Sequence, residues 1–92
     1  MKYSLIVNPH GGVKSGLKIL EKVKPFFEEA DADLNIIETE YAGHARDIAS
    51  EVPFDGFTGL CAIGGDGTMH EMVNGMMTRK DGMRIPIGLI TG

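Results

Sequence analysis

Cysteine is almost missing from this sequence of 92 residues, which contains Cys61 alone. An internal disulfide is therefore excluded, and a reducing compartment is the simplest interpretation. No apolar run approaches the roughly 18 residues that a membrane span requires. The first nine residues also lack the long apolar segment of a signal peptide. These absences indicate a cytoplasmic domain and leave peripheral contact with a membrane surface open.

Basic residues are also few, since 9 Lys and Arg stand against 13 Asp and Glu and the formal net charge is −4. Nucleic-acid binding needs a basic footprint for the phosphates, so we expect no nucleic acid as a partner. Lys14, Lys18 and Lys22 do recur at helical spacing. We interpret them as a solvated helix face, with an anionic membrane surface as the alternative.

Glycine is the residue that this chain has in excess. It supplies 13 of the 92 residues, where about 7% is usual. The glycines are not spaced in threes, which excludes collagen. They cluster at turns between apolar runs, where the missing side chain lets the backbone approach a ligand closely. Ligand contacts made by the main chain are therefore expected.

Apolar runs alternate with helical patterns along the chain. We expect strands at 3–8, 33–39, 60–63 and 85–90, and helices over a segment with apolar positions from Leu17 to Ala30, over 43–51 and over 68–79. Pro25 predicts a kink or a break near Lys24. Strands that are apolar throughout and alternate with helices are typical of a parallel sheet covered on both faces. We predict one α/β domain over residues 1–92, a Rossmann-like open parallel sheet with three α/β/α layers in the order β-α-β-α-β-α-β.

The loops that follow the first three strands are the expected ligand site. Ligands of such sheets bind beyond the carboxyl ends of the strands. Residues 8–16, 39–44 and 64–71 all fall there. We therefore expect these three segments to converge.

The sharpest motif is Gly64-Gly65-Asp66-Gly67-Thr68, between a strand and a helix. Its glycines allow close backbone approach, and the helix that follows points free N–H groups and a positive dipole end at the loop. This suits a polyphosphate. Asp66 would then hold Mg²⁺, directly or through water, or accept a proton from an attacking hydroxyl. The alternative is a plain turn in which Asp66 or Thr68 caps the helix, because Thr68 and Glu71 fit a capping box.

The other two loops carry weaker signals. The first, Asn8-Pro9-His10-Gly11-Gly12, is neither a Walker loop nor a Gly-x-Gly-x-x-Gly motif, but Asn8 offers a side-chain amide to a nucleotide. The hydroxyl of Thr39 could bond a phosphate or a ribose. A glycine-rich turn and an ordinary strand-end threonine are the alternatives. His44, near a helix start, is interpreted as structural.

Together these segments resemble the N-terminal half of the diacylglycerol kinase catalytic family, which includes diacylglycerol, sphingosine and ceramide kinases and bacterial lipid kinases. The matching stretches are Asn8-Pro9-x-x-Gly12-x-x-x-Gly16, Thr39 with Gly43-His44-Ala45, Gly64-Gly65-Asp66-Gly67-Thr68, Glu71-x-x-Asn74-Gly75 and Pro86-Ile87-Gly88-Leu89-Ile90. NAD kinases and phosphofructokinases carry similar glycine-aspartate motifs. The Asn-Pro start and the Thr…Gly-His-Ala segment favour lipid kinases.

The resemblance implies binding of ATP and Mg²⁺ and transfer of the γ-phosphoryl group to a lipid hydroxyl, of a diacylglycerol or sphingoid type. The residues that would contact the nucleotide are Asn8, Thr39, Gly64, Gly65, Asp66, Gly67, Thr68 and Glu71. Within this set, Asp66 takes the catalytic role, in hydroxyl activation or in the Mg²⁺ network, and Glu71 supports the nucleotide site.

The sequence departs from the family pattern at two positions. Gly11 stands where serine or another small residue is common, and Thr91 stands where proline is common before a Gly-Thr-x-Asn-Asp loop. That loop and the C-terminal β-rich domain that helps to bind the lipid lie outside the 92 residues. We therefore expect a truncated domain with little or no kinase activity by itself. An NAD kinase-like domain and a non-catalytic nucleotide-binding regulatory module remain as alternatives.

Overall fold

The computed structural model describes residues 1–8 and 16–90. Within these ranges the elements are β1 (Lys2–Val7), α1 (Gly16–Glu29), β2 (Asp33–Glu38), α2 (His44–Glu51), β3 (Gly59–Ile63), α3 (Asp66–Met77) and β4 (Ile87–Ile90). The strands are parallel and lie in the order β2-β1-β3-β4. The predicted Rossmann-like α/β class is confirmed. No helix in the described part of the chain is long and apolar enough to cross a membrane.

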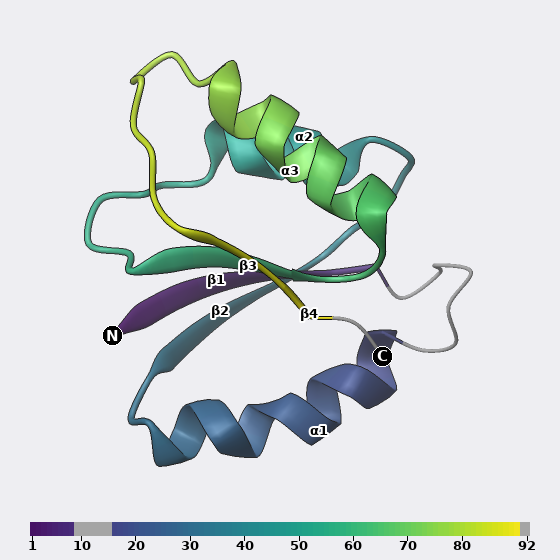
Figure 1. Cartoon of the computed structure of the whole chain (residues 1–92), viewed down its shortest axis with the longest axis vertical. Helices are drawn as coiled ribbons and strands as arrows, with labels where there is room; N and C mark the ends of the chain where they lie inside the picture. Colours follow the sequence, from purple (N-terminus) through teal and green to yellow (C-terminus); the bar gives the residue numbers. More distant parts are fainter. Residues whose placement is uncertain (9–15, 91–92) are drawn as a thin grey trace.

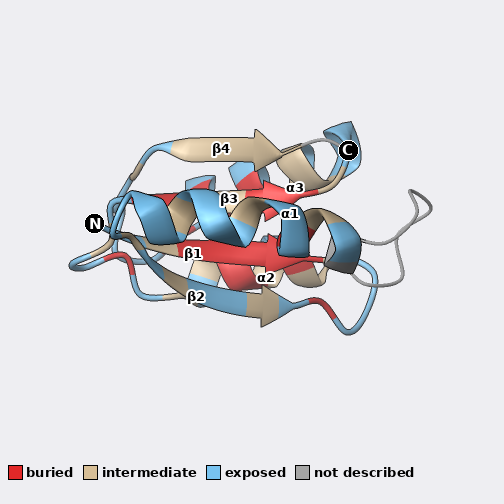
Figure 2. Ribbon diagram, turned by 90° about the horizontal axis from the view of Figure 1, so that it is seen from below, coloured by how far each residue is buried: buried red, intermediate tan, exposed pale blue. Residues whose placement is uncertain are grey.

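The sheet is the middle of three layers, with α1 on one face and α2 and α3 on the other (Figure 1). Successive residues of a strand point to opposite faces, so each central strand contributes side chains to two hydrophobic cores. Leu5 and Val7 of β1 pack with Leu20 of α1, whereas Ile6 packs with Met72 of α3. Figure 2 shows the resulting burial of β1 and β3. Burial on both faces explains the unbroken apolar runs at 5–7 in β1 and 60–63 in β3.

The strands end level with one another along one edge of the sheet. Val7, the last residue of β1, pairs with Glu38 of β2 on one side and with Ile63 of β3 on the other. Ile63 in turn pairs with Ile90 of β4. The residues that follow β1, β2 and β3 therefore begin at one common edge.

Of the kink or break predicted near Lys24, the break is wrong, because α1 continues through Pro25 to Glu29. A proline inside a helix removes one backbone hydrogen bond and crowds the preceding turn. Contacts on both sides of Pro25 hold α1 on the sheet. Leu20 is buried before it, and after it the ring of Phe27 packs edge-on against Tyr3 with centroids 5.7 Å apart.

A glycine permits the close contact between α2 and α3. A Cβ atom on Gly75 would clash with the carbonyl oxygen of Arg46 and would lie 2.8 Å from the Cβ of Ala49. Both neighbours belong to α2, and one of them is main chain that cannot rotate away. The helices can therefore approach this closely only with glycine at position 75.

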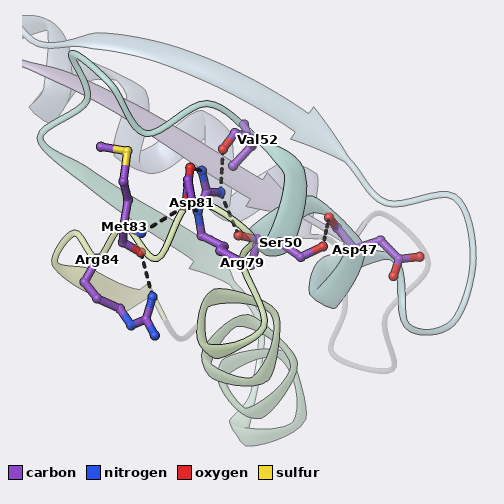
Figure 3. Close-up of polar contacts among 8 residues, drawn as sticks. Asp47, Ser50, Val52, Arg79, Asp81, Met83 and Arg84 are labelled. Atoms are coloured by element: carbon purple, nitrogen blue, oxygen red, sulfur yellow. Dashed lines mark hydrogen bonds and ion pairs between the residues drawn. The ribbon is translucent and has the colours of Figure 1, made fainter.

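The C-terminal end of α3 is attached to α2 by a buried arginine (Figure 3). The side chain of Arg79 is only 4% exposed. Its guanidinium donates to the carbonyls of Ala49 (3.1 Å) and Val52 (2.6 Å), and it forms two bonds with the Asp81 carboxylate at 2.9 and 2.6 Å. It also stacks 3.6 Å from the ring centre of Phe54. Arg79 thus satisfies carbonyls at the end of α2 that would otherwise lack partners.

Candidate functional site

Two of the three expected loops, those that follow β1 and β2, start beside each other at the edge where the strands end. The N–H of Thr39 donates to the carbonyl of Val7 at 2.8 Å, so the β1–β2 ladder extends one residue past β2. Thr39 therefore lies beside Asn8, and it is 8% exposed. Residues 9–15 lie outside the described part of the chain, and with them the glycines of the first loop, His10 and Lys14.

The third loop begins on the other side of Asn8. Val7 pairs with Ile63, so Gly64 follows at the same level, and its N–H donates to the carbonyl of Ile90 at 3.2 Å. Thr39 and Gly64 are thus separated by two strand spacings, about 10 Å. The fold brings these strand-end residues to one rim, and their contact with a ligand stays a prediction.

Helix α3 begins at Asp66, two residues earlier than expected. Gly65 is its N-cap residue, in an extended conformation, and no side chain of the described residues caps the helix. The alternative with Asp66 or Thr68 as the cap, and the capping box of Thr68 with Glu71, are therefore wrong. The first helical N–H groups that find a backbone acceptor are those of Thr68 and Met69, which reach the Gly65 carbonyl at 3.1 and 3.3 Å. Within the described residues, the N–H groups of Asp66 and Gly67 keep their donor capacity.

The motif glycines serve two different purposes. A Cβ on Gly64 would lie 2.5 Å from the Thr68 hydroxyl oxygen, so glycine there permits close packing of strand and helix. Within residues 1–8 and 16–90, a Cβ on Gly65 or Gly67 would meet nothing within 4 Å, and neither residue has a positive φ. Packing against the described residues and backbone conformation therefore do not require glycine at 65 or 67. Glycine in a helix costs about 0.5–1 kcal/mol relative to alanine, and here it leaves open space over the free N–H groups.

The carboxylates at this edge do not form a preassembled metal cage. Asp66 is exposed and makes no hydrogen bond or ion pair within residues 1–8 and 16–90. Glu71 is half-buried five residues further along α3, about 140° around the helix from Asp66. No cluster of three acidic, histidine or cysteine ligands occurs in the described residues. One carboxylate with open coordination positions suits Mg²⁺, which is commonly bound by one or two carboxylates together with substrate phosphates.

The loop between β2 and α2 is held by local contacts. Gly43 has φ 87°, a left-handed conformation that favours glycine. The Nδ1 atom of His44 accepts a 2.9 Å bond from the N–H of Glu40. The structural interpretation of His44 is thereby confirmed, because this bond closes the turn that follows Thr39.

The same loop displays an aromatic side chain that the sequence patterns did not single out. The ring of Tyr41 stacks on the imidazole of His44, with centroids 4.3 Å apart and planes 17° apart. Its hydroxyl donates to the Asp47 carboxylate at 2.7 Å, and this bond raises the pKa of the phenol. Tyr41 remains 55% exposed. A single exposed tyrosine has no periodicity, so only the geometry reveals it.

Comparison with known proteins agrees with this geometry. Residues 2–92 match the family model for the diacylglycerol kinase catalytic domain. The chain belongs to this family. It is 40% identical to sphingosine kinase 1 of Arabidopsis thaliana over 93 residues, which cover 97% of this chain and 19% of the relative. It is 38% identical to sphingosine kinase 1 of Mus musculus over 78 residues, which cover 84% and 20%.

A solved structure is similar along nearly the whole chain. The crystal structure of a diacylglycerol kinase from Bacillus anthracis str. Sterne matches with a TM-score of 0.77 and 32% identity, over 99% of this chain and 32% of that one. The family resemblance predicted from the motifs is confirmed. This diacylglycerol kinase-type domain spans about a fifth of the length of the curated relatives it matches.

Proposed function

We propose that this chain is the ATP-binding half of a lipid kinase that transfers the γ-phosphoryl group of ATP to a lipid hydroxyl. One observation carries the proposal. Among the described residues, none occupies the space that Gly65 and Gly67 leave over the first N–H groups of α3, at the edge where Thr39 and Asn8 follow neighbouring strands. Family membership supplies the reaction class, since the relatives are named as sphingosine and diacylglycerol kinases.

The phosphates would lie at the start of α3. The N–H groups of Asp66 and Gly67 are donors that a phosphate oxygen can accept from, and the positive end of the helix dipole favours negative charge there. Asn8 and Thr39 would contact the ribose or a phosphate from the adjoining strands. Thr68 fills the space that Gly64 leaves and so supports the loop from beneath.

Asp66 would carry the chemistry. In phosphoryl transfer, positioning and charge neutralisation do most of the catalytic work. Bound Mg²⁺ would neutralise charge on the phosphates, and Asp66 is the carboxylate that would hold it. The alternative role is acceptance of a proton from the lipid hydroxyl. Its exposure and its lack of a partner in the described residues leave the carboxylate available for either role. Glu71 would support the site from the next turn of α3.

The lipid would be bound with a C-terminal β-rich domain, as the family resemblance implies. The 92 residues alone would therefore show little or no turnover. Peripheral contact with the membrane that contains the lipid is part of this proposal.

The test uses the full-length protein with Asp66→Asn. We expect loss of most phosphorylation of diacylglycerol or sphingosine, with unchanged thermal unfolding, because the substitution removes charge from an exposed side chain. The control is Asp55→Asn, an exposed aspartate in the turn before β3, which should retain activity.

Other outcomes would overturn the proposal. Wild-type turnover in Asp66→Asn would remove the catalytic role of Asp66. Phosphorylation of NAD with no lipid product would identify an NAD kinase-like enzyme. Binding of Mg·ATP without transfer to any of these acceptors would identify a non-catalytic nucleotide-binding module.

A further inference from the structure

Tyr41 is an exposed ring that is nevertheless held in place. His44 covers one face of the ring, and Asp47 holds the hydroxyl. Since Tyr41 is still 55% exposed, the exposed area lies mainly on the opposite face and along the ring edge. A tyrosine that is already ordered offers a flat contact surface at little further cost in conformational entropy.

The Tyr41 ring belongs to the loop that follows β2, at the edge of the sheet where β1, β2 and β3 end. Tyr41 is two residues beyond Thr39, so their Cα atoms are at most about 7 Å apart. The N–H of Thr39 is bonded to Val7, which ties the loop to the end of β1. Gly64, two residues before α3, lies two strand spacings from Thr39, about 10 Å. If the phosphates of a nucleotide lie at the start of α3, its base lies away from them along the edge where the strands end, on the scale of these distances.

The charges around Tyr41 decide which end of a nucleotide lies there. Glu40, Asp47 and Glu51 all act electrostatically on the Tyr41 hydroxyl. Arg46 offsets this only in part, through a 4.0 Å ion pair with Asp47 at the surface. An acidic surrounding repels a triphosphate but tolerates an uncharged base. The free N–H groups at α3 have the opposite preference.

We propose that Tyr41 is the base-stacking residue of the nucleotide site, with the purine of ATP on the ring face opposite His44. The proposal rests on the proposed function, because it needs the phosphates at α3. It assigns His44 and Asp47 as positioning residues that hold the ring, and it makes the loop between β2 and α2 the part of the site that recognises the base. Bases stack on aromatic side chains whatever their hydrogen-bonding edge, so the contact contributes affinity for any purine.

The test measures the binding of two probes to the full-length protein by calorimetry. The probes are Mg·ATP and Mg·tripolyphosphate, which has the phosphates without the base. Tyr41→Ala should weaken ATP binding about tenfold and leave tripolyphosphate binding unchanged. Tyr41→Leu, of similar size without an aromatic face, should behave like Tyr41→Ala. Tyr41→Phe should stay within about threefold of the wild type, because the stacking face is kept.

A matched control removes an exposed ring elsewhere. Phe26 of α1 is 69% exposed, and Phe26→Ala should leave the binding of both probes unchanged. Unchanged ATP affinity in Tyr41→Ala would overturn the stacking role while the phosphate site stands. Equal losses for both probes would also overturn it, because Tyr41 would then only order the loop. If wild-type protein binds neither probe, the proposed function itself fails.

Discussion

The two ends of α3 use glycine for opposite reasons. Near the C-terminal end, main chain of α2 occupies the position that a side chain at Gly75 would need. Arg79 attaches the turn after α3 to the same helix, α2. At the N-terminal end, no atom of the described residues lies within 4 Å of the Cβ that a side chain at Gly67 would have. A missing side chain thus marks a packing contact at one end and open space over free N–H groups at the other. The surroundings of a glycine, and not the glycine itself, indicate which role it has.

The largest expected effect tests the packed end. Gly75→Ala should lower the free energy of unfolding of the full-length protein by about 2–3 kcal/mol, because an added methyl group overlaps immobile main chain. Urea unfolding followed by circular dichroism measures this. Asn74→Ala, at the exposed neighbouring position, is the control and should change stability by less than about 0.5 kcal/mol. A Gly75→Ala protein as stable as the control would show that α2 and α3 can separate freely.

Removal of Arg79 should come next. Arg79→Ala deletes charge-assisted bonds to Ala49 and Val52 and the stacking on Phe54. We expect a loss of about 2 kcal/mol, since the freed carbonyls at the end of α2 can partly be solvated by water. Arg79→Lys should recover only part of this, because an ammonium group cannot bond two carbonyls and a carboxylate in one plane. Full recovery with lysine would mean that charge alone matters.

Adding a methyl group at the N-terminal end of α3 should change the stability of the protein in the opposite direction. Gly67→Ala should raise the free energy of unfolding by about 0.5–1 kcal/mol, because alanine is the better helix former and meets no neighbour. The same substitution should weaken Mg·ATP binding by at least tenfold, since the methyl group occupies space next to the free N–H groups. Thermal unfolding and calorimetry on one preparation test both expectations. A more stable protein with unchanged ATP affinity would disconnect this end of α3 from the nucleotide.

The smallest effect concerns acid. The bond from Arg79 lowers the pKa of the Asp81 carboxyl below its usual range. A carboxyl whose pKa is lower in the folded than in the unfolded state stabilises the fold above its unfolded pKa, near 3.9, and this contribution disappears as the pH falls through the folded value. Unfolding of wild type and Asp81→Asn should therefore differ most at neutral pH and converge as the pH falls through the lowered pKa of the folded state. Parallel curves down to pH 2 would contradict this contribution.

The sequence predicted those parts of the fold that follow from local patterns. The apolar runs at 5–7 and 60–63 are unbroken because two cores surround β1 and β3, and the common edge could be expected because parallel strands end together. Of the kink or break predicted at Pro25, the break was wrong, since contacts of Leu20 and Phe27 with the rest of the protein outweigh the local cost of proline. The capping box failed because the helix starts two residues earlier, with Thr68 packed against Gly64.

Contacts between distant parts of the chain could not be predicted. Arg79 bonds to carbonyls 27 and 30 residues away, and nothing in its neighbourhood in the sequence distinguishes it from a surface arginine. Tyr41 is equally inconspicuous, because its ordering depends on the stack with His44 and on the bond to Asp47. The glycine-aspartate motif was visible, but the distinction between Gly64 and Gly67 needed the positions of their neighbours.

The pairing of Val7 with Ile63 has one more consequence. A slip of β3 by a single residue would exchange Leu60 and Ala62 with Cys61 and Ile63 between the two cores, so side-chain packing on both faces of the sheet fixes where β3 ends. The relative position of Asn8 and Gly64 is therefore set by the interior of the domain. The proposed nucleotide site should therefore keep its shape as ionic strength varies, and should lose it only when the sheet itself unfolds.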